Sequence, residues 1–252
     1  MIAAILVLSV IFALPFLLAR CIHTSHPGRA FFILPFAVAG IEWARSFDVL
    51  AFPWMIIGNS QTYYPFLVQF ADITSVFGVS FWVAAVNILL LLVIRKRSIV
   101  RFSALAAIFI IPHVYSIYVI SHVEESGERL TVACIQGNVF PEDKWATGNE
   151  LWNIDLYCNM SIDSAEYNPD VIIWPETATP VYLCETPTYR RKVQSLVDSI
   201  GIPVITGTPA INWKTGEKWN AACVFTPGSS TIPQYRKIHL VPFGEAIPGR
   251  SI

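Results

Sequence analysis

Two residues of this sequence have side chains and neighbours suited to acid–base chemistry. The first, Glu176, ends the segment Asp170-Val-Ile-Ile-Trp-Pro-Glu176, in which Val171 to Trp174 are apolar and mostly β-prone, as in a short buried strand. Pro175 ends that strand, because proline has no N–H to donate to a neighbouring strand. A carboxylate at the carboxyl end of a buried strand commonly faces a crevice. The plain alternative is a solvated glutamate that opens a turn.

The second residue is Lys237, in Tyr235-Arg-Lys-Ile-His-Leu-Val-Pro-Phe-Gly-Glu245. The pattern places Lys237 at the end of another strand, and a rigid Pro-Phe-Gly turn then delivers Glu245. In acyl transfer, a glutamate can act as general base while an ammonium group stabilises the oxyanion. Taken alone, Lys237 is an ordinary exposed lysine, so its interpretation depends on the elements that position it.

Composition divides the chain into two halves. The 252 residues are 54% hydrophobic and 14% charged, with eight Trp, which is too apolar for an ordinary soluble protein. Residues 1–120 hold seven Lys/Arg and three Asp/Glu, whereas residues 121–252 hold ten and fifteen. We therefore expect a transmembrane region over 1–120 and a water-soluble domain over 121–252. No basic, aromatic-rich stretch favours nucleic acid, and no metal, P-loop or dinucleotide motif predicts a cofactor.

The first half contains four apolar segments, at residues 1–19, 30–43, 75–94 and 100–120. The first has about the 20 residues that cross a bilayer, and it lacks the basic start of a secretory signal. Six of the seven basic residues fall in the two loops that alternation places on one side, which the positive-inside rule assigns to the cytoplasm. The second half is then expected on the outer side.

The segment 44–74 is expected to lie at the membrane surface. Phe52–Ile57 and Tyr63–Phe70 are aromatic and apolar but too short to span, which indicates interfacial or re-entrant pieces. Glu42 and Arg45 are three residues apart and could pair on one helix face. An ionisable residue at membrane depth is a functional candidate, and an anchoring pair at the interface is the alternative.

The second half has an α/β pattern. Strands are expected at 130–135, 171–174, 203–207 and 221–225, and helices at 146–166 and 187–200, with a hairpin tip at 213–219. Residues 231–235 lead into the last segment. Thr186, Pro187 and Gly201 bracket the second helix. The strands are too apolar to alternate, which predicts a sheet covered on both faces. The first helix should bury one face at a 3.6-residue period, formed by Leu151, Ile154, Cys158, Ile162 and Ala165.

The five cysteines do not form a recognisable site. Cys134 and Cys223 fall in strands expected to be buried and Cys158 on an apolar helix face, so we expect all three to serve packing. Cys21 lies in a loop. Cys184 precedes a helix start with no nearby His, which makes it a weak candidate for a nucleophile.

Taken together, the motifs resemble a known family. Ile173-Trp-Pro-Glu176, Tyr235-x-Lys237 with Leu240-Val-Pro-Phe-Gly-Glu245, and Gln136-Gly-Asn138 with Lys144-Trp145 resemble the apolipoprotein N-acyltransferases, bacterial inner-membrane enzymes with a nitrilase-like domain facing the periplasm. Glu42-x-x-Arg45, Phe52-Pro-Trp54 and Gly58-x-Ser60-Gln61 are similar to the family's last spans before that domain. The resemblance runs from about residue 30 onward, whereas Trp-Pro-Glu alone would indicate only the nitrilase superfamily.

The resemblance implies a membrane α-helical N-terminal half followed by an incomplete α/β nitrilase-like (αββα sandwich) domain. It implies that Glu176 is the general base, that Lys237 stabilises the transition state, and that Trp145 and Glu245 line or support the site. The family's nucleophile is a cysteine in a Cys-Tyr-Glu motif downstream of Pro-Phe-Gly-Glu, and none of the five cysteines corresponds to it. On this basis we expect an internal or truncated fragment that is inactive alone.

The resemblance also implies a function, lipoprotein maturation. An acyl chain would pass from a phospholipid to a cysteine thioester and then to the N-terminal amine of a diacylglyceryl-cysteine apolipoprotein. It implies a monomer in the bacterial inner membrane, multi-pass, with the catalytic domain on the periplasmic side and no cofactor. Two alternatives stay open: a membrane-tethered carbon–nitrogen hydrolase acting on a small amide, and a polytopic binding or transport protein without chemistry.

Overall fold

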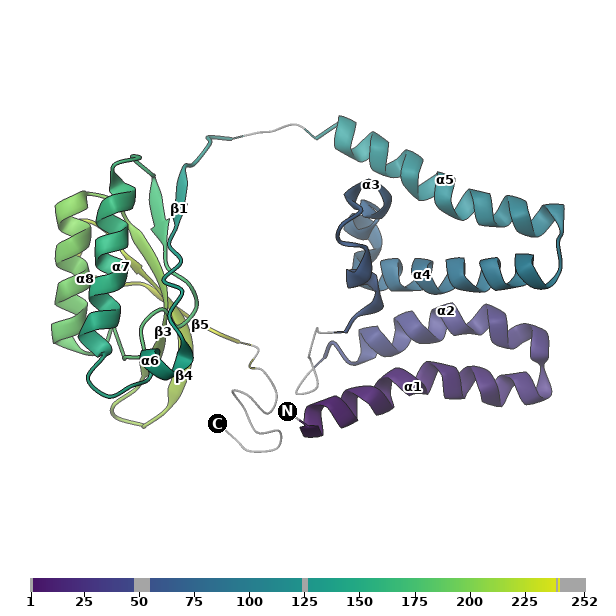
Figure 1. Ribbon diagram of the computed structural model, residues 1–252, viewed down its shortest axis with the longest axis horizontal. Helices are drawn as coiled ribbons and strands as arrows, with labels where there is room; N and C mark the ends of the chain where they lie inside the picture. Colours follow the sequence, from purple (N-terminus) through teal and green to yellow (C-terminus); the bar gives the residue numbers. More distant parts are fainter. Residues whose placement is uncertain (1, 48–54, 124–126, 239, 241–252) are drawn as a thin grey trace. The chain divides into compact units, whose positions relative to one another are not determined.

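The computed structural model describes residues 2–47, 55–123, 127–238 and 240, which form two compact units (Figure 1). The long apolar helices of the first unit lie within residues 1–125, and the sheet of the second unit lies within residues 126–239. The helices of the first unit are α1 (Ile2–Ser25), α2 (Pro27–Ala44), the 3₁₀ helix η2 (Ile57–Gln61), α3 (Pro65–Val68), α4 (Ala71–Arg95) and α5 (Ile99–Ser121).

Among the described residues, three helices are long and apolar enough to cross a membrane: α1 from Ile5, α4 and α5. Many of their large apolar side chains are exposed, as are Phe16, Ile94 and Ile111, while their backbone polar groups are paired inside each helix, as a lipid environment requires. A fourth span over 30–43 stays a prediction, because α2 is helical there but is not among these three helices.

Consecutive long helices of this unit pack side by side, α1 on α2, α2 on α4 and α4 on α5. Phe36 of α2 meets Phe81 of α4 edge-on with ring centroids 4.8 Å apart, and Trp82 of α4 donates its indole N–H to the carbonyl of Ile108 in α5 at 2.7 Å. Figure 1 shows the α1–α2 and α4–α5 connections at the same end of the unit. These two connections are flanked by the six basic residues from which the positive-inside rule predicts the orientation.

The short segment η2 is held by two side chains from the long helices. Glu42 of α2 is buried, and its Oε1 accepts a hydrogen bond from the backbone N–H of Ile57 at 2.8 Å. The hydroxyl of Ser80 in α4 accepts the N–H of Gly58 at 2.8 Å. Residues 52–54 of the aromatic segment 52–57 lie outside the described residues, whereas Tyr63 in the second aromatic segment is exposed.

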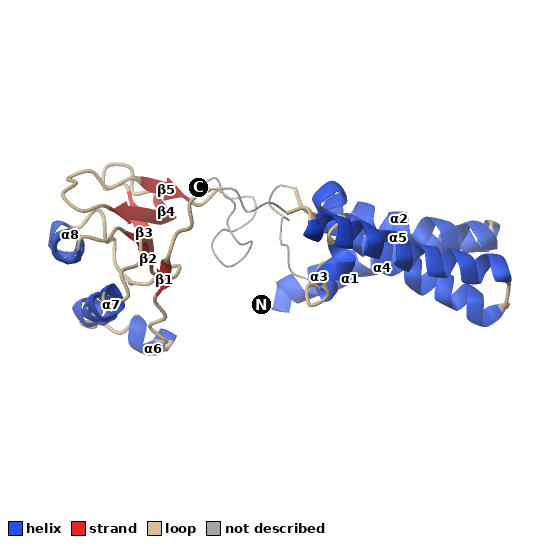
Figure 2. Cartoon of the chain, turned by 90° about the horizontal axis from the view of Figure 1, so that it is seen from above, coloured by secondary structure: helices blue, strands red, loops and turns tan. Residues whose placement is uncertain are grey.

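The second unit is built on one mixed sheet. Its strands are β1 (Val132–Cys134), β2 (Val171–Ile173), β3 (Val204–Ile211), β4 (Lys218–Phe225) and β5 (Gln234–Arg236), in that spatial order. The pairs β1–β2 and β2–β3 are parallel, and β3–β4 and β4–β5 are antiparallel. The helices are α6 (Pro141–Lys144), α7 (Glu150–Ala165) and α8 (Pro187–Ile200). Figure 2 shows α7 and α8 on the same face of the sheet.

The core lies between this sheet face and the two helices, where Ile154, Ile172, Val193 and Phe225 are fully buried. Along β3, buried and half-buried side chains alternate, because successive side chains of a strand point to opposite faces. The prediction that the strands do not alternate is therefore wrong for β3, and cover over the second face of the sheet stays a prediction. The face away from α7 and α8 is half-buried, and it is the face that carries the site described below.

Two further predictions of buried residues are wrong, one for a strand at the edge of the sheet and one for the buried face of a helix. β1 is an edge strand, so Val132 and Cys134 are exposed, although the apolar composition of this strand predicted burial. In α7 the buried face consists of Asn153, Ile154, Tyr157, Cys158 and Ser161. The predicted members Leu151 and Ile162 are exposed. The polar Asn153 and Ser161 face the core instead, where Ser161 accepts the buried indole N–H of Trp174.

The ends of α8 follow the predicted signals. Pro187 begins the helix and Gly201 ends it in the left-handed conformation, with a φ of 70°. Thr186 is the residue before the helix, but its side chain makes no capping hydrogen bond. The predicted hairpin tip lies between β3 and β4, where Gly216, with a φ of 76°, donates its N–H to the carbonyl of Asn212 at 2.7 Å.

Candidate active site

Glu176 emerges from the strand β2, in the interior of the sheet. The backbone pairing continues for one residue beyond β2, because the N–H of Trp174 donates to the carbonyl of Ile205 at 2.8 Å. Pro175 has no N–H and ends this pairing. The chain then presents Glu176 at the carboxyl end of β2, which is where the sequence pattern places it.

The end of β2 is tied to α7 through Trp174. Its side chain is only 2% exposed, and the indole N–H donates to the hydroxyl oxygen of Ser161 at 2.8 Å. That hydroxyl in turn donates to the carbonyl of Tyr157 at 2.7 Å, and the ring of Tyr157 lies 5.3 Å from the indole ring. Because Trp174 is two residues before Glu176, this packing restricts where the glutamate backbone can lie.

The backbone of Glu176 also lies directly against Gly207 of β3. A methyl group at residue 207 would lie 2.6 Å from the Cα of Glu176 and 2.9 Å from the N of Thr177. The carbonyl of Gly207 accepts the N–H of Ala178 at 3.1 Å, which holds the two segments together. Thr177 completes the turn with a φ of 50°, in the left-handed region. The close approach therefore requires glycine at residue 207.

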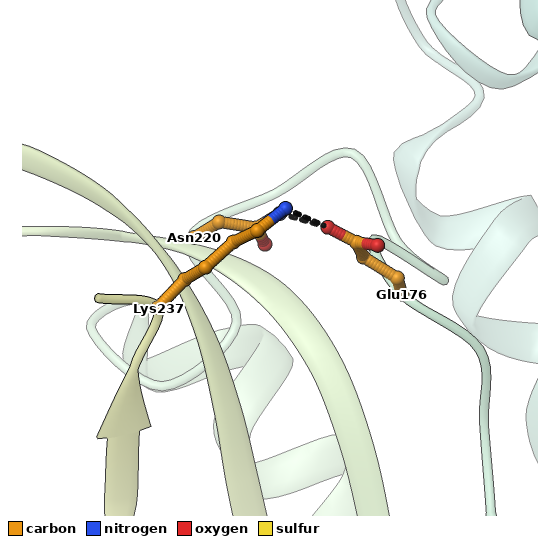
Figure 3. A network of polar contacts seen from close by, with 3 residues as sticks. All are labelled: Glu176, Asn220 and Lys237. Carbon is orange, nitrogen blue, oxygen red and sulfur yellow. Dashed lines mark hydrogen bonds and ion pairs between the residues drawn. The ribbon is translucent and has the colours of Figure 1, made fainter. Parts of the chain in front are cut away.

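Lys237 reaches Glu176 from the far edge of the described sheet. It follows β5 directly, and its backbone N–H donates to the carbonyl of Asn220 in β4 at 2.8 Å. Its Nζ lies 3.1 Å from Oε1 of Glu176, close enough for a hydrogen bond and an ion pair (Figure 3). The two side chains that the sequence singled out, 61 residues apart, thus meet on one face of the sheet.

Asn220 is a third member of this group, and sequence reasoning missed it. It lies in β4, and its side-chain amide donates to Oε1 of Glu176, the same oxygen that Lys237 contacts. Figure 3 shows all three side chains converging. The sequence offers only a weak signal for it, a polar residue between Trp219 and Ala221 near the start of a strand. The pairing of β4 with β5 places it beside Lys237.

These three polar side chains lie beside an open pocket of about 390 Å³. The half-buried side chains of Ile173, Ile205 and Ala222 also line this pocket. The side chains of Lys237 and Glu176 are 31% and 63% exposed, so the ion pair contributes little to stability. What the pair offers is chemical: the carboxylate of Glu176 can take a proton, and the ammonium of Lys237 beside it can offset negative charge that develops during a reaction.

Two other residues predicted for the site are not brought into it by the described structure. Trp145 follows α6, is 58% exposed, and is not among the described residues that line the pocket. Glu245 lies outside the described residues. The roles assigned to these two residues stay predictions.

None of the five cysteines is among the described residues lining the pocket. Cys184 is buried, and its hydrogen bond with Cys223 together with its burial raises the pKa of the thiol. Burial likewise raises the pKa of Cys158, to about 11. Cys21 and Cys134 are exposed. The thiols of Cys158 and Cys184 are therefore held in the protonated, unreactive form.

Each of the two units matches a family of known proteins. Residues 131–252 match the family profile described as carbon-nitrogen hydrolase, so the second unit is a nitrilase-like domain of that superfamily. Residues 1–89 match the profile described as the apolipoprotein N-acyltransferase N-terminal domain. A solved structure of a Saccharomyces cerevisiae member of branch 10 of the nitrilase superfamily overlaps 50% of this chain and 52% of its own, with 17% identity and a TM-score of 0.38.

Curated relatives match across both units. The apolipoprotein N-acyltransferase of Geobacter metallireducens is 32% identical over 225 residues, which cover 85% of this chain and 43% of the relative. That of Chlorobaculum tepidum is 32% identical over 244 residues, 87% of this chain and 46% of the relative. The chain belongs to the apolipoprotein N-acyltransferase family. It spans about half the length of the curated relatives it matches.

Proposed function

We propose that this chain contributes the general base and the oxyanion-stabilising ammonium of a phospholipid-to-lipoprotein acyl transfer. The observation that supports this most directly is the contact between Glu176 Oε1 and Lys237 Nζ at 3.1 Å, on a pocket with an apolar lining. The three membrane-capable helices support a membrane location for the lipid substrates. The names of the relatives support the reaction class.

In the first step, Glu176 takes the proton of a cysteine thiol while the sulfur attacks the ester carbonyl of a phospholipid. The oxyanion that forms is stabilised by Lys237. Collapse of this intermediate breaks the bond to the glycerol oxygen, which takes the proton from Glu176. The products are a thioester on the cysteine and a lysophospholipid.

In the second step, the α-amine of a diacylglyceryl-cysteine apolipoprotein attacks the thioester carbonyl. Glu176 takes a proton from the attacking nitrogen, and the thiolate leaves and is protonated. The products are an N-acylated lipoprotein and the free thiol. The same carboxylate thus serves as base and then acid in each half-reaction.

The thiol is proposed to come from outside these 252 residues. Three of the five cysteines are buried, and none of the five lines the described pocket. We further propose that the protein works as a monomer in the bacterial inner membrane, with the nitrilase-like domain on the periplasmic side. The basic residues that flank the α1–α2 and α4–α5 connections support that orientation.

The test uses a phospholipid with a labelled acyl chain, the 252-residue chain, and the longest polypeptide translated from the same gene. We expect a hydroxylamine-sensitive thioester only on a polypeptide that carries an additional cysteine. In that polypeptide, Glu176→Gln should lower the rate of thioester formation by about 10²- to 10⁴-fold and Lys237→Met by about 10²- to 10³-fold.

Matched controls come from the exposed β3–β4 hairpin, where Glu217→Gln and Lys218→Met remove the same charges away from the pocket. Both should retain the full rate. A thioester on one of the five cysteines of the 252-residue chain would contradict the proposal. Hydrolysis of small amides without acyl transfer would favour the carbon–nitrogen hydrolase alternative.

A further inference from the structure

We infer that Asn220 is a positioning residue that determines which oxygen of the Glu176 carboxylate accepts the proton. The inference rests on the proposed function of Glu176 as general base. The side-chain amide of Asn220 donates to Oε1, and Nζ of Lys237 contacts the same oxygen. Two donors are therefore gathered on Oε1.

Asn220 contacts both members of the pair. Its side chain donates to Glu176, while its backbone carbonyl accepts the N–H of Lys237 at 2.8 Å. It is paired in register with Pro209 of β3 on one side, and the neighbouring pair Ala221–Arg236 joins β4 to β5 on the other. Asn220 is therefore held by backbone pairing on both sides of its strand.

Without such a donor, the carboxylate of Glu176 would be poorly oriented. The terminal torsion of a glutamate side chain has a broad, roughly two-fold preference, and this side chain is 63% exposed. Lys237 alone is a weak restraint, because its ammonium sits on a flexible four-carbon stem. Asn220 has a short side chain on a central strand, so its amide is the rigid donor of the two.

Holding Oε1 assigns different tasks to the two oxygens. Oε1 keeps the carboxylate plane fixed between two donors, and Oε2 is directed to the proton that the base removes. General-base catalysis depends on this orientation, since the acceptor oxygen must lie within hydrogen-bond reach of the proton. Loss of Asn220 should slow the chemical step and leave substrate binding in the apolar part of the pocket unchanged.

The first arm of the test is spectroscopic and needs no activity. The 252-residue chain is solubilised in detergent, its Asn side chains are labelled with ¹⁵N, and their amide signals are recorded by NMR. The signal of the Asn220 side chain is identified as the one that Asn220→Asp removes. We expect Glu176→Ala to shift this signal toward those of the other Asn side chains, because the amide loses its carboxylate acceptor. An Asn220 signal unchanged by Glu176→Ala overturns the inference, whatever the activity.

The second arm is kinetic and uses the longest polypeptide from the same gene. Asn220→Ala and the shape-matched Asn220→Asp should lower kcat by about 10- to 100-fold with KM within about twofold. The control Asn212→Ala, in the β3–β4 turn, should change neither value. A folded Asn220→Ala protein, judged by thermal unfolding, that keeps the wild-type kcat also overturns the inference. Absence of acyl transfer in the wild type would instead count against the proposed function, and the spectroscopic arm would then decide the inference.

Discussion

The substitution Gly207→Ala tests whether the close approach of two strands positions the base. The added methyl group would lie 2.6 Å from the Cα of Glu176, 2.9 Å from the N of Thr177 and 3.0 Å from the O of Pro175. All three are backbone atoms, so no side-chain rotation can relieve the overlap. Reaching the shortest ordinary contact, 3.4 Å, requires the Glu176 backbone to move by about 0.8 Å.

A displacement of this size has a calculable effect on the reaction. A misplacement of about 1 Å can cost about 10²-fold in rate, so we expect acyl transfer to fall by about 30- to 100-fold. At about 1.36 kcal/mol for each factor of ten, the barrier rises by about 2–3 kcal/mol. The overpacking itself should lower the free energy of unfolding by about 1–3 kcal/mol, which leaves room for the domain to stay folded.

The assay is thioester formation from a labelled phospholipid by the longest polypeptide of the same gene, together with thermal unfolding. The matched control is Gly40→Ala in α2, where a methyl group would meet nothing within 4 Å. That variant should keep the wild-type rate. A folded Gly207→Ala protein with a rate within twofold of wild type would refute the argument that contact with Gly207 positions Glu176.

Two further predictions concern the stability of the nitrilase-like domain. Ser161→Ala removes the acceptor of the buried indole N–H of Trp174, which should cost about 1–3 kcal/mol in denaturant unfolding; a loss under 0.5 kcal/mol would contradict this role. Burial raises the pKa of Cys158 from 9.0 to about 11, so the unfolded thiol ionises first and stability should be lost as the pH rises from about 9 through 11. Cys158→Ala should flatten that decline in urea unfolding measured from pH 8 to pH 11, and an unchanged slope would count against it.

Local sequence patterns predicted the elements whose signals act over a few residues. Pro187 and Gly201 mark the ends of α8, because a proline is tolerated in the first helical turn and a glycine accepts the left-handed conformation that ends a helix. The apolar run before Pro175 likewise predicted β2 and the position of Glu176 after it. These outcomes depend on backbone preferences of the residues themselves.

Other features could not be predicted locally. The apolar composition of Cys134 and its neighbours indicated burial, but β1 is an edge strand and exposes them. The periodicity of α7 included Ile162 in the buried face, but a hydrogen bond to Trp174 places Ser161 in the core instead. Strand order and cross-element hydrogen bonds decide such cases, and neither is encoded within a single segment.

The sequence by itself determined the candidates for the proposed chemistry, Glu176 after a proline-terminated strand and Lys237 before the Pro-Phe-Gly motif, and the motifs that identify the family. Only the tertiary structure decided that the two meet, because they lie 61 residues apart and come from strands that are not neighbours. It also decided that Asn220 and Gly207 belong to the same arrangement. Asn220 acts through the carboxylate oxygen that it shares with Lys237, and Gly207 acts through a backbone approach that leaves no room for a methyl group. Both depend on proximity that exists only once β2, β3, β4 and β5 have paired.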